Sequence, residues 1–177
     1  MHKHILITGL SGTGKTHLYK FFKEKGKNSY DADEALGRWV DKKTGKPKTP
    51  TKKEEEQARG IDWGWDGRKL NRILKQNNEV YLFGGLSEHT TQFVRLFDKI
   101  YYLYAGKELI LQRLRSKDRN NDFGRHPEQR RLIISWIKYA AERAKREGFE
   151  FIDAALSPQQ IFNIICKTGK RKRKLTK

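Results

Sequence analysis

Short apolar runs alternate with amphipathic segments along most of the chain. The runs have the length and composition of buried strands and cover residues 5–7, 28–30, 80–83, 100–104 and 149–152. Apolar residues at helical spacing separate them, in about residues 15–26, 32–41, 66–77, 93–97, 109–114 and 128–147, and Pro158 marks the start of a last helix. Strands that alternate with helices predict parallel βαβ units. We therefore expect an α/β fold, a three-layer α/β/α domain around a five-stranded parallel sheet.

Two polar stretches interrupt this alternation. Residues 42–60 are rich in Lys, Pro, Thr and Gly and predict a loop. Trp63 and Trp65 follow, in a loop before the next predicted helix, where they could stack on a base or sugar or cover the core. The sequence favours neither use of the two rings. Residues 115–127 are rich in Arg, Asp and Asn and predict a second loop, which ends at Pro127.

Length and composition fit a single domain. The chain has 177 residues, of which 36% are hydrophobic and 11% aromatic, enough to fill one core. No apolar stretch approaches the roughly 20 residues that a membrane span needs, and the first residues lack the apolar region and cleavage site of a signal peptide. Cys166 is the only cysteine, which excludes an intrachain disulfide and a Cys-rich zinc site. These features predict a cytoplasmic protein with no membrane partner.

The charge is the unusual part of the composition. There are 39 Lys and Arg residues against 21 Asp and Glu residues, a formal net charge of +18. Basic residues without any acidic residue fill the end of the chain, so we expect residues 168–177 to form a solvated tail beyond a domain of residues 1–167. So basic a balance favours a polyanionic partner such as nucleic acid, or phosphorylated ligands.

The strongest functional motif follows the first predicted strand. Residues 9–16 match the phosphate-binding pattern G-x-x-x-x-G-K-[ST] at every fixed position. Its glycines let backbone N–H groups point at phosphate oxygens, and the following helix adds its positive end. Lys15 can bridge the β- and γ-phosphates of ATP, and the Thr16 hydroxyl can ligate Mg²⁺. The predicted nucleotide-binding residues are Gly9, Ser11, Gly12, Thr13, Gly14, Lys15, Thr16 and His17.

Two carboxylates follow the second predicted strand, in the sequence Asp31-Ala32-Asp33. The carboxyl ends of parallel strands line the ligand crevice of such sheets, which would bring both side chains near the phosphate loop. Carboxylates there can hold Mg²⁺ through water and receive or orient a substrate hydroxyl. The alternative is that Asp31 or Asp33 caps the next helix.

Arginines cluster around the second polar loop. Phosphoryl transfer spreads negative charge over the equatorial oxygens, and guanidinium groups stabilise that charge. The cluster predicts a mobile lid over about residues 115–127, with Arg119 and Arg125 as candidate catalytic side chains. A solvated basic loop is the alternative. The cluster consists of Arg113, Arg115, Arg119, Arg125, Arg130 and Arg131.

Together these features resemble the shikimate kinase/adenylate kinase-like group of P-loop kinases. The resemblance covers about residues 1–166 and rests on the phosphate loop, the Asp31-Ala32-Asp33 sequence, Gly84-Gly85 after the third strand, and the Arg-rich loop with Gly124. It implies that Asp31 lies near Mg²⁺, that Asp33 contacts the acceptor hydroxyl, and that Gly84 and Gly85 line the substrate site.

The resemblance has departures that leave the acceptor open. Shikimate kinases carry a third glycine after strand three, where this chain has Leu86. Their arginine signature for the substrate carboxylate is missing, and Arg68 is a loose candidate for that role. The Asp-Gly-Phe-Pro-Arg segment of adenylate kinases is also absent.

The motifs also separate the classes of P-loop protein. A GTPase switch needs an Asn-Lys-x-Asp sequence, which is absent, and motor ATPases need a longer chain and a strand that ends in Asp-Glu. We therefore predict an ATP- and Mg²⁺-dependent phosphotransferase that acts on a hydroxyl or phosphate of a small metabolite, nucleoside or nucleotide. Two alternatives stay open: a kinase or binder that acts on nucleic acid, and a nucleotide-dependent binding module with weak ATPase activity.

Overall fold

The main sheet has five parallel strands. The structure is a computed structural model that describes residues 2–57, 59–116 and 123–167. The strands lie in the order β2-β5-β1-β6-β7, and each neighbouring pair is parallel. Their bounds are Lys3–Thr8 for β1, Ser29–Asp31 for β2, Glu79–Phe83 for β5, Lys99–Tyr104 for β6 and Glu150–Asp153 for β7. The predicted five-stranded parallel sheet is confirmed.

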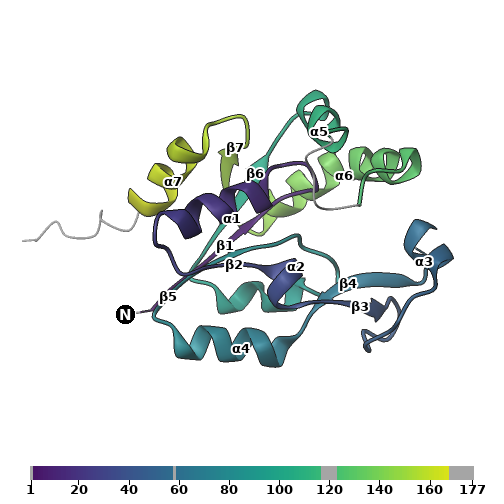
Figure 1. The fold of residues 1–177 in the computed structure, drawn as a ribbon, viewed down its shortest axis with the longest axis horizontal. Helices are drawn as coiled ribbons and strands as arrows, with labels where there is room; N and C mark the ends of the chain where they lie inside the picture. Colours follow the sequence, from purple (N-terminus) through teal and green to yellow (C-terminus); the bar gives the residue numbers. More distant parts are fainter. Residues whose placement is uncertain (1, 58, 117–122, 168–177) are drawn as a thin grey trace, which may run out of the picture.

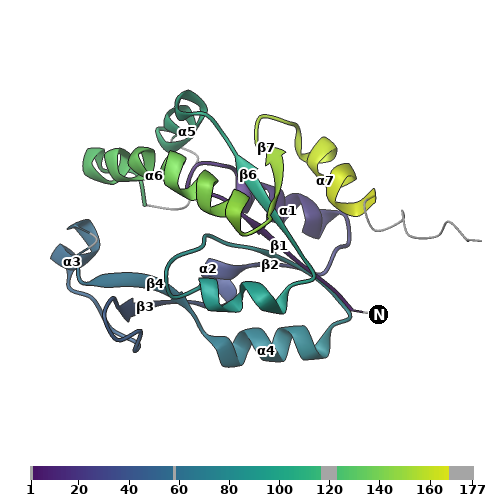
Figure 2. The same cartoon turned by 180° about the vertical axis from the view of Figure 1, so that it is seen from behind.

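Helices cover both faces of this sheet (Figure 1; Figure 2). On one face, α1 (Lys15–Glu24), α5 (Lys107–Leu114) and α7 (Pro158–Lys167) pack on the side chains that β1 points toward them, among them Ile5 and Ile7. On the other face, α4 (Gly67–Gln76) and the 3-10 helix η1 (Thr91–Leu96) enclose Leu6. The long helix α6 (Pro127–Arg146) packs Ala144 against Tyr102 and Phe149. The three predicted layers are therefore present, with a 3-10 helix where an α-helix was expected at residues 93–97.

The central strand explains why this sheet could be predicted. Ile5, Leu6 and Ile7 are each at most 2% exposed, because β1 is covered on both faces. A strand of this kind has a continuous apolar sequence rather than an alternating one. Burial of each such side chain stabilises the fold by roughly 1.5–3 kcal/mol, so the pattern is strongly constrained.

The segment between β2 and α4 differs from the sequence-based prediction. The helix expected over residues 32–41 is limited to α2 (Ala32–Ala35), and β3 (Gly37–Asp41) then pairs antiparallel with β4 (Ile61–Trp65). Trp63 and Trp65 therefore lie on a strand and not in a loop. The rings of Trp39 and Trp63 are opposite each other in the register, with centroids 4.8 Å apart and an interplanar angle of 80°. Such cross-strand aromatic pairs stabilise a strand by about 0.2–1 kcal/mol. This stabilisation outweighs the weak preference for a helix that the apolar spacing in residues 32–41 indicates.

The loop expected over residues 42–60 also contains a short helix, α3 (Lys52–Gln57). Thr51 and Glu54 form a reciprocal capping box at its start: the Thr51 N–H donates to Glu54 at 2.9 Å, and the Glu54 N–H donates to the Thr51 hydroxyl at 3.3 Å. The Lys48 ammonium lies 2.7 Å from Glu54. Hydrogen bonds from Lys48 and then Thr51 lower the pKa of Glu54 to about 2. The hairpin and α3 project from the sheet on the side away from the amino terminus, and α3 contacts α6 (Figure 1).

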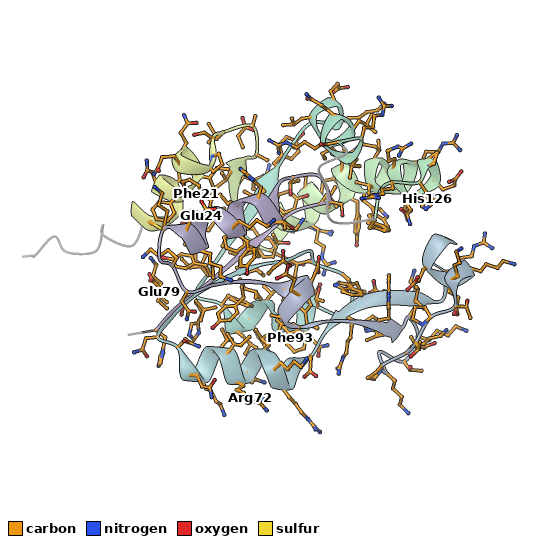
Figure 3. The ribbon with its side chains drawn as sticks, viewed as in Figure 1. Phe21, Glu24, Arg72, Glu79, Phe93 and His126 are labelled. Carbon is orange, nitrogen blue, oxygen red and sulfur yellow. The ribbon has the colours of Figure 1, made fainter. Side chains whose placement is uncertain are left out.

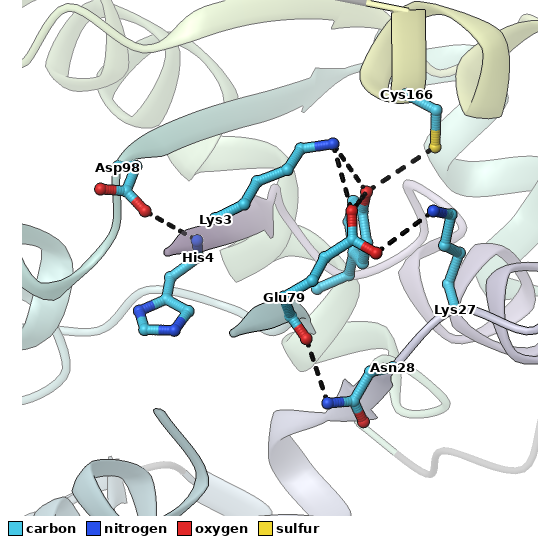
Figure 4. Close-up of polar contacts among 8 residues, drawn as sticks. Lys3, His4, Lys27, Asn28, Glu79, Asp98 and Cys166 are labelled. Atoms are coloured by element: carbon cyan, nitrogen blue, oxygen red, sulfur yellow. Dashed lines mark hydrogen bonds and ion pairs between the residues drawn. The ribbon is translucent and has the colours of Figure 1, made fainter. Parts of the chain in front are cut away.

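A polar cluster joins the strands at the opposite end of the sheet, where Glu79 lies (Figure 3; Figure 4). The Tyr81 hydroxyl donates to Glu79 at 2.7 Å, and the ammonium groups of Lys3 and Lys27 lie 3.3 and 3.2 Å from the same carboxylate. Burial alone would raise the pKa of Glu79. The hydrogen bonds from Tyr81 and Lys27 and the positive charges of Lys27 and Lys3 lower it by more, so the net result is a lowered pKa. Burial raises the pKa of Tyr81, which therefore stays a hydrogen-bond donor.

We expect Glu79→Gln to lower the free energy of unfolding at pH 7 by about 0.5–1 kcal/mol, since the carboxylate is partly screened by solvent. A lowered pKa means that ionised Glu79 stabilises the folded state above its ordinary pKa of 4.5, and that this contribution is lost as the pH falls below that value. Urea unfolding at pH 7 and pH 3 should show the difference from the wild type shrinking at pH 3. Glu142→Gln is the matched control, because Glu142 pairs with Lys138 only at 3.9 Å on an exposed helix face. An equal loss from both variants at pH 7 would contradict the role of the cluster.

Two parts of the sequence-based prediction lie outside the described residues. These are residues 117–122, which include Arg119, and residues 168–177, the predicted basic tail. The lid and the division into a domain of residues 1–167 and a tail therefore stay predictions. None of the helices in the described parts of the chain is both long and apolar enough to cross a membrane.

Candidate active site

The phosphate loop connects β1 to α1, and its glycines are required by geometry. Gly12 and Gly14 have positive φ angles of 87° and 95°, a conformation that side chains disfavour. A Cβ atom at Gly9 would lie 2.6 Å from the Leu103 carbonyl oxygen. The Thr13 hydroxyl donates to the Leu10 carbonyl at 2.8 Å and is buried. The conformation of the loop therefore requires glycine at these positions and includes a hydrogen bond within the loop.

Lys15 lies against this loop. Its ammonium donates to the carbonyl oxygens of Gly9 at 2.7 Å and Leu10 at 2.9 Å. Thr16 and His17, in the first turn of α1, are exposed. The loop glycines, the Lys15 ammonium and the amino end of α1 thus lie together, and groups of these kinds bind phosphate in proteins. Ser11, also in the loop, is half-buried.

Arg113 hydrogen-bonds the backbone of the phosphate loop. Its guanidinium donates to the Thr13 carbonyl at 3.1 Å and to the Ala154 carbonyl at 2.9 Å. Burial lowers the pKa of Arg113, and the charge of Asp153 opposes that change. Arg113 thus joins α5, the phosphate loop and the end of β7. The sequence placed this residue in an arginine cluster around a lid, but its role in the structure is to brace the loop.

The other described arginines of the cluster make no hydrogen bond to the phosphate loop that the described residues show. Arg130 donates to the carbonyl oxygens of Gly124, at 3.3 Å, and Arg125. The Gly124 N–H donates to the buried Gln129 side chain at 2.8 Å. These bonds hold residues 124–125 to the start of α6, where the side chain of Arg125 is exposed. Arg115 and Arg131 are exposed as well.

The two predicted carboxylates lie at the carboxyl end of β2. Asp31 is 6% exposed and caps α2, because its side chain accepts from the Asp33 N–H at 2.9 Å. Asp33 is open to solvent, and its carboxylate accepts from the Trp63 indole N–H at 2.7 Å. Capping by Asp31 is therefore confirmed, and it leaves Asp33 at the surface of the site.

The surroundings of Asp33 connect it to the phosphate loop. The protein around this carboxylate raises its pKa by desolvation, although solvent reaches it. The positive charge of Lys15 lowers the pKa, the negative charge of Asp31 raises it and the hydrogen bond from Trp63 lowers it, and the net result is a raised pKa. Asp33 and Lys15 are thus close enough for their charges to interact.

Gly84 and Gly85 end β5 at the same edge of the sheet. Phe83 pairs with Asp31 on one side and with Ile7 on the other, so the ends of β2, β5 and β1 are aligned. A Cβ atom at Gly84 would lie 2.6 Å from Ala32 and 2.8 Å from the Trp65 ring, whereas one at Gly85 would meet nothing within 4 Å. Gly84 is therefore required by packing, and Gly85 has open space beside it.

Arg68, a candidate for substrate binding, lies in the first turn of α4 and is exposed. Among the described residues its side chain makes no hydrogen bond or ion pair that joins it to the carboxylates. The nearby hairpin carries Arg38, which sequence reasoning missed and which pairs with Asp66 at 3.5 Å. Arg68 stays a prediction, as do Thr16 and Asp31 as ligands of Mg²⁺. In the parts of the chain described, no three His, Cys, Asp or Glu side chains gather in a metal-binding group.

No protein-family model matches the sequence, and no curated protein sequence matches it. Solved structures do match. Shikimate kinase from Acinetobacter baumannii in complex with shikimate has a TM-score of 0.62 at 20% identity and covers 97% of both chains. Deoxyadenosine kinase from M. mycoides with bound dATP has a TM-score of 0.53 at 13% identity, over 93% of this chain and 98% of that one. A gluconokinase from Sinorhizobium meliloti 1021 has a TM-score of 0.54 at 12% identity, over 92% and 89%.

At these identities the similarity concerns the fold. The chain has the fold of the P-loop small-molecule kinases, and the resemblance drawn from its motifs is confirmed at that level. The three kinases act on different acceptors, so the shared fold does not select one.

Proposed function

We propose that this protein is an ATP-dependent phosphotransferase whose acceptor is a small molecule with a free hydroxyl or phosphate group. The observation that supports this most directly is the meeting of two elements at one edge of the sheet. Lys15 of the phosphate loop and the solvent-accessible carboxylate of Asp33 lie close enough for their charges to interact. A donor-phosphate site beside a carboxylate is what transfer to an acceptor requires.

The chain's own residues would hold the nucleotide as follows. The backbone of residues 9–16 and the amino end of α1 would bind the phosphates, and Lys15 would neutralise their charge. Thr16 and Asp31 would hold Mg²⁺, which usually takes few protein ligands and completes its shell with phosphate oxygens and water. ATP, when bound with Mg²⁺, supplies the phosphoryl group. Such an enzyme would work in the cytoplasm, where ATP and Mg²⁺ are both available.

Asp33 would orient the acceptor. One of its oxygens is held by Trp63, and the carboxylate can accept the proton of an acceptor hydroxyl. The raised pKa of Asp33 makes it a better proton acceptor than an ordinary aspartate. Arg125, and Arg119 outside the described residues, are the proposed side chains of a lid that would exclude water. Exclusion of water matters because an open site hydrolyses ATP.

The experiment that tests this function is a screen for acceptor-dependent ADP release. Purified protein with ATP and Mg²⁺ is offered nucleosides, nucleotides, sugars, hydroxy acids including shikimate, and DNA and RNA ends. We expect one chemical class to raise ADP release well above the acceptor-free rate. Acceptor-independent ADP release with every compound would favour the binding module with weak ATPase activity.

A nucleic-acid end is the second candidate acceptor, because the hairpin beside the site is basic. Exposed lysines surround the hairpin tip, at Lys42, Lys43, Lys46, Lys52 and Lys53. We expect binding of a labelled oligonucleotide to weaken by about 10³-fold or more between 50 and 200 mM salt if six or more phosphates are contacted. Replacement of Lys42, Lys43 and Lys46 by glutamate should reduce the salt dependence. Replacement of Lys20, Lys23 and Lys25 around α1 is the matched control. Weak binding that does not depend on salt would remove this candidate.

A further inference from the structure

The β3–β4 hairpin is fastened to the edge of the sheet that carries the site. The Ser87 hydroxyl, just after Gly84-Gly85, donates to the Trp63 carbonyl at 2.6 Å. The His89 ring bonds the Lys42 carbonyl at 3.0 Å, near the hairpin tip. The Trp65 ring stacks on Phe93 of η1, with centroids 6.2 Å apart and an interplanar angle of 17°. Contacts at the base and near the tip thus hold the hairpin in one position against the domain.

The indole of Trp63 is aimed at Asp33 by its packing. Its ring lies edge to face with Trp39, and it occupies the space beside Gly37 so closely that a Cβ atom there would lie 2.9 Å from Trp63 Cε2. The ring thus has little room to turn. Its Nε1–H donates to Asp33 Oδ1 at 2.7 Å. A hydrogen bond to a carboxylate at this distance is among the stronger ones in proteins.

Asp33 is held from one side only. Its Oδ1 atom accepts from Trp63, and no other described residue donates a hydrogen bond to its carboxylate. Asp33 also lies after β2 in the short helix α2, outside any strand, so the sheet does not fix its side chain. The rotamer of a solvent-accessible aspartate would otherwise be free to change. Trp63 is the contact that removes this freedom.

We infer that Trp63 is a positioning residue of the phosphotransfer site: it orients the Asp33 carboxylate so that the oxygen not bonded to the indole accepts the acceptor's hydroxyl hydrogen. The catalytic role of Trp63 rests on the proposed function. The Trp63–Asp33 hydrogen bond rests only on the geometry of the hairpin. The hairpin therefore holds the candidate base through this one hydrogen bond. Neither Trp39 nor Trp65 bonds a carboxylate in the described structure, so the role belongs to Trp63.

Trp63→Phe tests the inference, because phenylalanine keeps an aromatic ring and removes the N–H donor. We expect kcat to fall by about 10- to 100-fold, the usual worth of a hydrogen bond to a charged group, while KM for ATP changes less than threefold. Trp136→Phe is the matched control, because Trp136 is exposed on α6 outside the hairpin, and it should change kcat by less than threefold. A double variant, Asp33→Asn with Trp63→Phe, should be no slower than Asp33→Asn alone, because Trp63 acts through Asp33. Thermal melting of each variant shows whether it folds.

A second readout does not depend on activity. The chain has four tryptophans, so an ¹H–¹⁵N spectrum contains four indole signals. Asp33→Asn should shift the one signal that disappears in Trp63→Phe, and Asp98→Asn should shift none of the four. Unmoved indole signals in Asp33→Asn, or equal kcat losses in Trp63→Phe and Trp136→Phe, would overturn the inference. If instead the indole signal shifts but no acceptor is ever phosphorylated, the contact stands and the proposed function fails.

Discussion

Lys15→Ala should lower the rate of phosphoryl transfer by at least about 10²- to 10³-fold, the usual cost of removing one donor from a preorganised anion site. The Lys15 ammonium donates to the carbonyl oxygens of Gly9 and Leu10, in a loop where Gly12 and Gly14 have positive φ angles. Among the described side chains, Thr13 also donates to one of these two oxygens, that of Leu10. The measurement is acceptor-dependent ADP release at saturating ATP, together with the dissociation constant for a fluorescent ATP analogue.

The matched control is Lys20→Ala, on the exposed face of the same helix. It removes the same charge and the same side chain, so it should leave both the rate and the affinity within twofold of the wild type. Circular dichroism should show both variants folded, because the Lys15 side chain is only half-buried. A Lys15→Ala variant with wild-type transfer would mean that the loop does not hold the reacting nucleotide.

Asp33→Asn should lower kcat for transfer by about 10²- to 10⁴-fold, the range that a general base contributes. Asparagine has the same size and can still accept the Trp63 hydrogen bond, but it cannot take a proton. Affinity for ATP should change little, because Asp33 lies beside the phosphate loop and not in it. Steady-state rates over a range of acceptor concentrations separate the loss in kcat from any change in KM.

Asp98→Asn controls for the loss of one negative charge. Asp98 is exposed and accepts from the His4 N–H at 2.7 Å, at the opposite end of the sheet (Figure 4). It should behave as the wild type in transfer. If Asp33→Asn lowers ATP affinity and kcat by the same factor, Asp33 serves the nucleotide and not the acceptor.

The sheet and the phosphate loop were predictable because their signals are local. β1 is buried on both faces, so its apolar residues are contiguous, and the loop motif places glycines where the backbone leaves no space for a side chain. The position of Asp31 and Asp33 at this edge of the sheet was predictable for a related reason, since residues that follow parallel strands gather at one edge.

The hairpin could not be predicted in the same way, because its stability comes from contacts between distant residues. Trp39 and Trp63 are 24 positions apart, and a short segment such as 32–41 fits both helical and strand spacing. Two local signals were nevertheless present. Thr51-Lys52-Lys53-Glu54 is a capping-box sequence that marks the start of α3, and residues 61–65 are rich in the aromatic and β-branched residues that strands prefer.

Side-chain roles were harder to predict than element positions. Arg113 was grouped with lid arginines from its place in the sequence, but the structure joins it to the carbonyl oxygens of Thr13 and Ala154. Its neighbours Arg115 and Arg131 are exposed. A charge cluster in sequence therefore predicts basic character for a region, and only the packing determines which guanidinium braces the loop.

Transfer of the γ-³²P label from ATP to an acceptor tests the central claim most directly. Once the acceptor screen has identified a responsive compound, wild-type protein and Lys15→Ala are each incubated with labelled ATP, Mg²⁺ and that compound, and the products are separated. We expect one mole of labelled acceptor per mole of ADP with the wild type, little free labelled phosphate, and almost no labelled acceptor with Lys15→Ala. Free labelled phosphate in amounts equal to ADP, with the acceptor unlabelled, would contradict that claim.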